Sequence, residues 1–239
     1  MHRLSRATVA PLPGVRARGY PAMAISALPV IVPLPGAQVS LLPQWLAPSC
    51  ADALLDQLAT GVDWQTHRIR LYGRWLDCPR RSCWVGDADA AYRYSGATFQ
   101  PQPWSAPLAD LRERLEQGCA ARFNSVLLNL YRDGRDSMGW HADDEPELGP
   151  APLISSLSLG ARRDFQFRPR SGGPIACSLP LGHGDLLLMA GRTQQLYQHA
   201  LPRRARVTVP RINLTFRLIL PRAGRGGRLG PALQYRGRG

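Results

Sequence analysis

Short strand-like runs, separated by glycine and proline, fill much of residues 124–219 of this chain. They lie at 124–131, 153–159, 164–168, 185–190, 195–200 and 211–219. Many short strands with turn signals between them are typical of a β-sandwich or a β-barrel. Leucines at helical spacing predict two helices, at 49–60 and 105–117, which would pack outside the strands. We therefore expect a mainly β domain with flanking helices (α+β), in a chain long enough for one sizeable core.

The run from Arg211 to Leu218 has a strict period of two. Its polar residues, Arg211, Asn213, Thr215 and Arg217, alternate with Ile212, Leu214, Phe216 and Leu218. Such alternation places all the polar side chains on one face of a strand. Guanidinium groups hold carboxylates in bidentate pairs, so this face suits an acidic ligand. At about 3.3 Å per residue the two arginines lie roughly 20 Å apart, so both reach one small dicarboxylate only by leaning together. An edge strand with one wet face is the alternative for this segment alone.

Two histidines and a carboxylate form a candidate metal site. His141 and Asp143 are two residues apart, and His199 follows His141 after 58 residues. Residues i and i+2 share a face of a strand, so His141 and Asp143 can point to one metal while His199 comes from a strand across the barrel. Two histidines and one carboxylate are the ligand set of an open non-haem iron(II) site. Zinc is the competing metal, and the arginine pair, which a simple hydrolase does not need, favours iron.

Charge is concentrated at the two ends of the chain. The formal net charge is +13, yet residues 21–220 hold 21 arginines against 17 acidic residues. All 30 basic residues are arginine, which a GC-rich coding bias explains as well as phosphate binding does. Two groups of arginines flank the proposed metal ligands: Arg162, Arg163, Arg168 and Arg170, and then Arg203, Arg204 and Arg206. Clustered arginine beside a catalytic pocket favours a polyanionic substrate.

The ends of the chain differ in composition from its middle. We expect residues 1–37 to be a disordered or weakly ordered extension, and 221–239, with its Gly-Arg repeats, to be a flexible basic tail. Residues 38–220 then form a single domain. Prolines interrupt the apolar stretch 25–35 well short of a membrane span, so no membrane association is expected. Five cysteines without a Cys-x-x-Cys pair favour reduced thiols in a cytoplasmic protein.

Four other polar residues are not assigned to the site. His183 lies in a glycine-flanked turn and is expected to be structural rather than a ligand. Asp133 and Asp136 border a turn at Gly134 and are expected to be solvated. Asp164 is expected to make an internal salt bridge.

Five motifs follow one another in the second half of the chain. They are Asn124-Ser-Val-Leu-Leu-Asn129-Leu-Tyr131-Arg-Asp-Gly134; His141-x-Asp143-Asp-Glu145; Ser156-x-Ser158-x-Gly160-Ala-Arg-Arg-Asp164-Phe-x-Phe167-Arg168; Leu179-Pro-Leu-x-His183-Gly-Asp-Leu-Leu-Leu-Met189; and Pro210-Arg211-x-Asn213-Leu-Thr-Phe-Arg217. Together they resemble the AlkB-type iron(II)- and 2-oxoglutarate-dependent dioxygenases that repair alkylated nucleic acids. An upstream block, from Tyr72 to Trp104, is similar to the branch that includes animal homologues acting on double-stranded DNA. The resemblance implies a double-stranded β-helix (jelly-roll) dioxygenase core.

The resemblance also implies the cofactors and the residues that hold them. Iron(II), 2-oxoglutarate and O₂ are the implied cofactors, with a catalytic metal site of His141, Asp143 and His199. Arg211 and Arg217 would hold the carboxylates of 2-oxoglutarate. The implied hydrogen-bonding helpers are Asn129, Tyr131 and Asn213.

Substrate residues are implied in the same way. A duplex base must be flipped out to reach such a centre, which needs a wedge and a stacking cage. The wedge would be Tyr72 beside Gly73 at a hairpin tip, with Arg74 touching phosphate. The cage would be Tyr92, Tyr94 and Ser95. Glu145 would lie near the base edge and favour a cationic, alkylated ring.

The activity that follows is oxidative demethylation of 1-methyladenine and 3-methylcytosine in DNA. The alkyl group would be hydroxylated, with release of formaldehyde and succinate. Alkylated DNA, duplex or single-stranded, is the expected partner of a monomeric protein. The alternatives are a dioxygenase of the same fold that acts on RNA or protein, and a nucleic-acid-binding barrel that has lost its metal.

Overall fold

The computed structural model describes residues 28–71, 74–90, 92–94, 97–99 and 101–220. For residues 69–71, 74–76, 92–94 and 97–99 it describes the backbone alone. Most of the expected N-terminal extension and the whole C-terminal tail lie outside these ranges. Within the segment that we placed in the extension, Val30 and Ile31 pair with the next strand, and Val32 and Leu34 are buried in the core.

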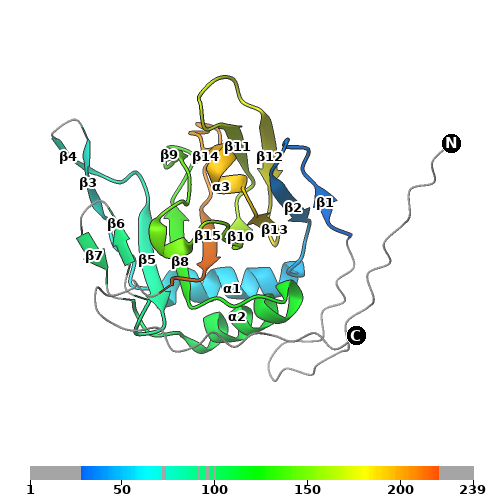
Figure 1. Ribbon diagram of the computed structural model, residues 1–239. Helices are drawn as coiled ribbons and strands as arrows, with labels where there is room; N and C mark the ends of the chain where they lie inside the picture. The colour runs from blue at the N-terminus through cyan, green and yellow to red at the C-terminus, as the bar shows by residue number, and fades with distance from the viewer. Residues whose placement is uncertain (1–27, 72–73, 91, 95–96, 100, 221–239) are drawn as a thin grey trace, which may run out of the picture.

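Fifteen strands and three α-helices make up the described chain (Figure 1). The strands of the larger sheet are β1 (Val30–Ile31), β2 (Gln38–Leu42), β5 (Arg81–Gly86), β8 (Ser125–Tyr131), β10 (Ile154–Gly160), β13 (Leu186–Ala190) and β15 (Arg211–Arg217). Those of the smaller sheet are β9 (Met138–His141), β11 (Arg163–Pro169), β12 (Cys177–Leu181) and β14 (Tyr197–Leu201). Two hairpins comprise β3 (Arg68–Leu71) with β4 (Arg74–Asp77), and β6 (Tyr92–Tyr94) with β7 (Ala97–Phe99). The helices are α1 (Pro48–Gly61), α2 (Ala106–Cys119) and α3 (Thr193–Leu196), with a 3-10 turn at Pro146–Leu148.

Two antiparallel sheets pack face to face. The larger has the strand order β1-β2-β13-β10-β15-β8-β5, and the smaller has the order β12-β11-β14-β9. Helices α1 and α2 lie together along the outer face of the larger sheet (Figure 1). This arrangement confirms the expected mainly β jelly-roll with flanking helices. Within the described ranges, none of the helices is long and apolar enough to cross a lipid bilayer.

Both expected helices are present, with shifted ends. Helix α1 begins at Pro48 after an Ala47 N-cap, so Ser49 lies in the first turn and does not cap it. Proline is favoured there because the first turn leaves its N–H groups without partners in any case. Helix α2 runs through Gly118 and ends at Cys119, and its C-cap residue Ala120 has a left-handed φ of 48°. Their leucines pack on the sheet, as the helical spacing predicts.

Alternate residues of β15 face two different buried regions of the protein. Ile212, Leu214 and Phe216 pack into the cluster under α1 and α2, while the alternate polar residues face the space between the sheets. Hydrogen bonds join β15 to β10 on one side and β8 on the other, and all seven of its residues are buried. The alternative of an edge strand with a wet face is therefore wrong, because β15 is central and its polar face is enclosed.

Candidate metal centre and its two cavities

The three expected metal ligands converge between the two sheets. One ligand atom from each of His141, Asp143 and His199 lies within 4.8 Å of the others. Each histidine Nε2 is 3.9 Å from a different carboxylate oxygen of Asp143. Such a cluster of two imidazoles and one carboxylate can hold a single divalent metal ion.

The strands that carry the histidines are neighbours. β9 and β14 pair antiparallel, and His141 is the direct register partner of His199, with ring centroids 4.2 Å apart. The expectation that His199 comes from across the barrel is wrong, because cross-strand pairing brings the two rings together. Asp143 is not in the strand either, since β9 ends at His141. The irregular segment that follows β9 places the Asp143 carboxylate beside the Nε2 atoms of both histidines.

Neighbouring groups that the sequence did not reveal orient the ligands. Nδ1 of His141 lies 2.9 Å from the carbonyl oxygen of Gly139. When Nδ1 donates there, Nε2 is left unprotonated toward Asp143, the form that binds metal. The backbone N–H of Asp143 donates to Oε1 of the buried Gln194 at 3.0 Å. Phe165 stacks on the His199 ring at 5.1 Å. Of these contacts, only that of Phe165 had a signal in the sequence, because Phe165 and Phe167 alternate with polar residues along β11.

Electrostatics keep the ligands in their metal-binding forms. Burial lowers the pKa of His199 to about 3, with His141 acting in the same direction, so the imidazole is neutral at pH 7. Burial alone would raise the pKa of Asp143, but Arg217 and the two imidazoles lower it to about 2. Nη2 of Arg217 lies 2.8 Å from Oδ1 of Asp143. The carboxyl is therefore ionised.

One cavity adjoins the metal ligands on the inner face of β15. All five residues expected to bind the cosubstrate line it: Asn129, Tyr131, Arg211, Asn213 and Arg217. Arg211 is 1% exposed and donates from Nη2 to the hydroxyl of Ser158 at 2.9 Å, while its Nε has no hydrogen-bond partner among the described residues. Burial lowers its pKa to about 10. A buried cation without a carboxylate partner suits an anionic ligand.

The amides around this cavity already have partners within the chain. Asn213 Nδ2 donates to the Ser156 hydroxyl at 2.8 Å and to the Leu157 carbonyl at 2.9 Å. Asn129 Oδ1 accepts from Nε of Arg80 at 2.9 Å. Sequence analysis missed Arg80 and Ser156, although the alternate serines of β10 are a period-two signal that places them on the same face.

A second cavity also adjoins the metal ligands. Glu145, His67, Cys78, Arg80 and Trp84 line it. Residues shared by the two cavities are Leu127, Asn129, Met138, His141, Asp143 and Arg217. The candidate metal centre thus borders two cavities: Arg211 and Arg217 line the first, and Arg80, Arg217 and Glu145 line the second.

The other expected substrate residues are not placed by the structure. Tyr72, Gly73 and Ser95 lie outside the described residues. Arg74 begins β4, while Tyr92 and Tyr94 are the two ends of β6, and each is described as backbone only.

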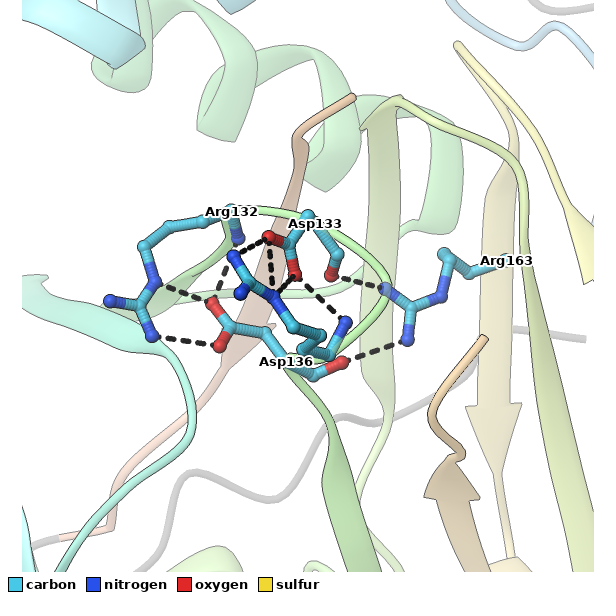
Figure 2. Close-up of polar contacts among 5 residues, drawn as sticks. Arg132, Asp133, Asp136 and Arg163 are labelled. Carbon is cyan, nitrogen blue, oxygen red and sulfur yellow. Dashed lines mark hydrogen bonds and ion pairs between the residues drawn. The ribbon is translucent and has the colours of Figure 1, made fainter. Parts of the chain in front are cut away.

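Several expected structural residues are resolved. His183 accepts at Nδ1 from the N–H of Gly160 and lies 3.2 Å from Asp52, a structural role as expected. Asp164 forms the expected salt bridge, with Arg204 at 2.6 Å. The expectation that Asp136 is solvated is wrong, because it is 4% exposed and pairs with Arg132 through both oxygens at 2.8 Å (Figure 2).

The residues present fit an iron(II) and 2-oxoglutarate site. Neutral imidazole and carboxylate are suitable iron(II) ligands, and the unpartnered Nε of Arg211 offers a buried donor to a carboxylate.

Residues 38–217 match the model of the 2OG-Fe(II) oxygenase superfamily, and the chain belongs to this superfamily. Its expected cofactors, iron(II) and 2-oxoglutarate with O₂, are those of the superfamily. The solved structure of OsALKBH1 superposes with a TM-score of 0.54 at 17% identity, over 75% of this chain and 97% of that one, which supports the fold.

Relatives place the chain in the AlkB-type branch. It is 41% identical over 180 residues to the DNA oxidative demethylase ALKBH2 of Homo sapiens, covering 71% of this chain and 69% of the relative. It is 39% identical over 193 residues to the alpha-ketoglutarate-dependent dioxygenase alkB homolog 3 of Homo sapiens, covering 77% and 67%. The Arabidopsis thaliana ALKBH2 is 36% identical over 191 residues, covering 69% and 61%. The expected family resemblance is confirmed.

Proposed function

We propose that the protein is an oxidative demethylase that removes alkyl groups from 1-methyladenine and 3-methylcytosine in DNA. The observation that carries this proposal is that the cluster of His141, Asp143 and His199 borders two cavities, one holding the buried Arg211 and the other lined by Glu145. Relatives named DNA oxidative demethylase, at about 40% identity, support the same activity.

In this proposal His141, Asp143 and His199 hold iron(II). Iron(II) with bound 2-oxoglutarate and O₂ supplies the oxidising chemistry that hydroxylates the alkyl carbon. Arg211 holds one carboxylate of 2-oxoglutarate at the deep end of its cavity, where its free Nε is available. Arg217 holds the other near the metal, because its guanidinium already contacts Asp143.

Three further residues would complete the cosubstrate site. Tyr131 lies beside Arg211, with the guanidinium carbon 5.5 Å from the ring centroid. Asn129 and Asn213 are register partners on β8 and β15, so they approach the cavity from adjacent strands. All three would orient the cosubstrate and exclude water from its carboxylates.

The second cavity would receive the damaged base. A carboxylate at Glu145 favours a cationic, alkylated ring over a neutral one. The nucleotide must be flipped out of a duplex at a cost of a few kcal/mol, which is smaller for a poorly paired, damaged base. We propose Tyr72 with Gly73 and Arg74 as the wedge, and Tyr92, Tyr94 and Ser95 as the cage. Base stacking on aromatic rings contributes about 1–3 kcal/mol per base.

We also propose that the protein acts as a cytoplasmic monomer on alkylated duplex DNA. Its catalytic domain would be residues 38–220, joined by β1 on the outer edge of β2, with residues 221–239 as a basic tail. The five free cysteines and the arginine-rich sequence support this proposal.

Formaldehyde release from defined oligonucleotides tests the function. The unaltered chain, with iron(II), 2-oxoglutarate and O₂, should release formaldehyde from 1-methyladenine in duplex DNA. Asp143→Asn should abolish the release, whereas Asp52→Asn should retain it, because Asp52 is an exposed carboxylate on α1. Matched single-stranded DNA and RNA substrates separate the alternatives. Release from a methylated protein and from none of the nucleic acids would refute the repair function.

A further inference from the structure

Arg163, at the start of β11, is buried deeply and lines neither cavity. It is 2% exposed and shares the inward face of β11 with Phe165 and Phe167. Burying a guanidinium is costly unless its N–H groups find acceptors. The partners of Arg163 therefore indicate why this position holds a cation.

Its hydrogen bonds run to three backbone carbonyls from two separate segments. Nη1 donates to the carbonyl of Asp133 at 3.1 Å, and Nη2 donates to that of Asp136 at 2.8 Å (Figure 2). Nη2 also donates to the carbonyl of Pro202 at 2.8 Å. A planar guanidinium can hold several acceptors at fixed angles, which the single ammonium of lysine cannot do.

Both segments are directly connected to strands that carry metal ligands: one precedes β9 and the other follows β14. Asp133 and Asp136 lie in the turn between β8 and β9, and β9 ends at His141. Pro202 follows the last residue of β14, the strand that carries His199. One side chain thus joins the start of one ligand strand to the end of the other.

The same two segments also meet through their backbones. Gly134 donates from its N–H to the Val207 carbonyl at 2.7 Å, and its carbonyl accepts from the N–H of Arg204 at 2.7 Å. A Cβ at Gly134 would lie 1.7 Å from the carbonyl oxygen of Arg204. Only glycine therefore fits at position 134, where the β8–β9 turn packs against the segment 202–207. Arg163 hydrogen-bonds to both of these segments.

Arg163 also approaches the cosubstrate end of the site. Its guanidinium carbon lies 5.9 Å from the Tyr131 ring centroid, and the carbon of Arg211 lies 5.5 Å from the same centroid. Tyr131 thus has a buried guanidinium near its ring from two directions. Loss of Arg163 would loosen Tyr131 as well as the two ligand strands.

We propose that Arg163 is a positioning residue of the metal centre, which sets the spacing of His141 and His199 by tying the β8–β9 turn to the end of β14. The inference rests on the proposed metal centre and deepens it. Arg163 touches no metal ligand and acts through the strands. Residues that hydrogen-bond a metal ligand directly change metal affinity by about 10–100-fold when they are removed, and for Arg163, which acts through the strands, we expect the lower end of that range.

Anaerobic iron(II) titration, without 2-oxoglutarate or nucleic acid, tests this role. Arg163→Met should weaken iron(II) binding at least about tenfold, at an unchanged far-ultraviolet circular dichroism spectrum. Arg163→Lys keeps the charge but lacks the planar guanidinium with its several N–H donors, so it should not restore the affinity for iron(II). The matched control is Arg112→Met, because Arg112 on α2 pairs with Asp87 at 2.9 Å and lies over Trp104 at 4.5 Å, away from the metal.

The outcomes separate this inference from the proposed function. Iron(II) binding that is lost with His141→Ala tests the metal centre itself, whatever Arg163 does. Wild-type affinity in folded Arg163→Met would overturn the positioning role, as would equal weakening in Arg112→Met at equal loss of thermal stability. If Arg163→Met does not fold, Arg163→Lys decides, and wild-type affinity in the folded lysine variant would overturn the role.

Discussion

Replacing Arg211 by methionine should stabilise the unliganded protein while it removes 2-oxoglutarate binding. The Arg211 guanidinium is fully buried, and its one hydrogen bond to a side chain is donated to Ser158. Its charge has no carboxylate partner among the described residues. Methionine has a similar length and carries no charge, so it removes the cost of burying the cation.

The magnitude follows from the pKa of Arg211, which burial lowers from 12.5 to about 10. At 1.36 kcal/mol per pKa unit, the buried charge costs roughly 3 kcal/mol of folding free energy. The folded pKa is below the unfolded one, so this cost is fully present at any pH below about 10. Losing the Ser158 hydrogen bond offsets about 1 kcal/mol. The variant should therefore gain about 2 kcal/mol, or about 4–8 °C in melting temperature.

Thermal unfolding of the metal-free chain, with and without 2-oxoglutarate, measures both effects. At 100 times its dissociation constant, 2-oxoglutarate should add about 2.7 kcal/mol to the unaltered protein and nothing to Arg211→Met. Arg217→Met is the matched control on the same strand. It should destabilise the unliganded chain, because Asp143 loses the buried partner that lies 2.8 Å away. A lower melting temperature for unliganded Arg211→Met, or retained stabilisation by 2-oxoglutarate, would refute the reasoning.

Four further changes have defined outcomes. Gln194→Leu removes the acceptor for the Asp143 N–H and should cost about 1–3 kcal/mol of stability by thermal unfolding, with roughly tenfold weaker iron(II) binding by titration. Gly134→Ala should lower the melting temperature sharply or prevent folding, because its Cβ would lie 1.7 Å from a carbonyl oxygen. Gly118→Ala, which meets nothing within 4 Å on α2, should instead gain about 0.5–1 kcal/mol. Tyr72→Ala should reduce formaldehyde release from duplex DNA more than from single strands, since only a duplex needs a wedge, and equal losses would remove that role.

Local patterns predicted the strand faces of the site well. Parity alone places Arg211 and Arg217 on the same face of β15, opposite Ile212, because side chains alternate along any strand. This even spacing does not determine whether that face of the strand is exposed to solvent. The burial of β15 between β8 and β10 depends on pairing with segments far away in the chain.

Contacts that depend on register or on backbone carbonyls were not predictable. His141 and His199 meet because β9 pairs with β14, a long-range pairing that no local pattern encodes. Arg163 binds carbonyl oxygens, which every residue type carries, so sequence gives no sign of its partners. Asp136 resembled an ordinary turn residue because its burial comes from Arg132 and the packed turn.

The placement of β9 at the outside of the smaller sheet has a consequence for how long iron stays bound. β9 has a hydrogen-bonded strand on one side only, so its local opening requires less free energy than global unfolding. His141 would leave the metal first, while Asp143 and His199, each 4% exposed, stay buried. The lifetime of the bound metal is then governed by the opening of one outer strand, a motion that amide hydrogen exchange along β9 reports directly.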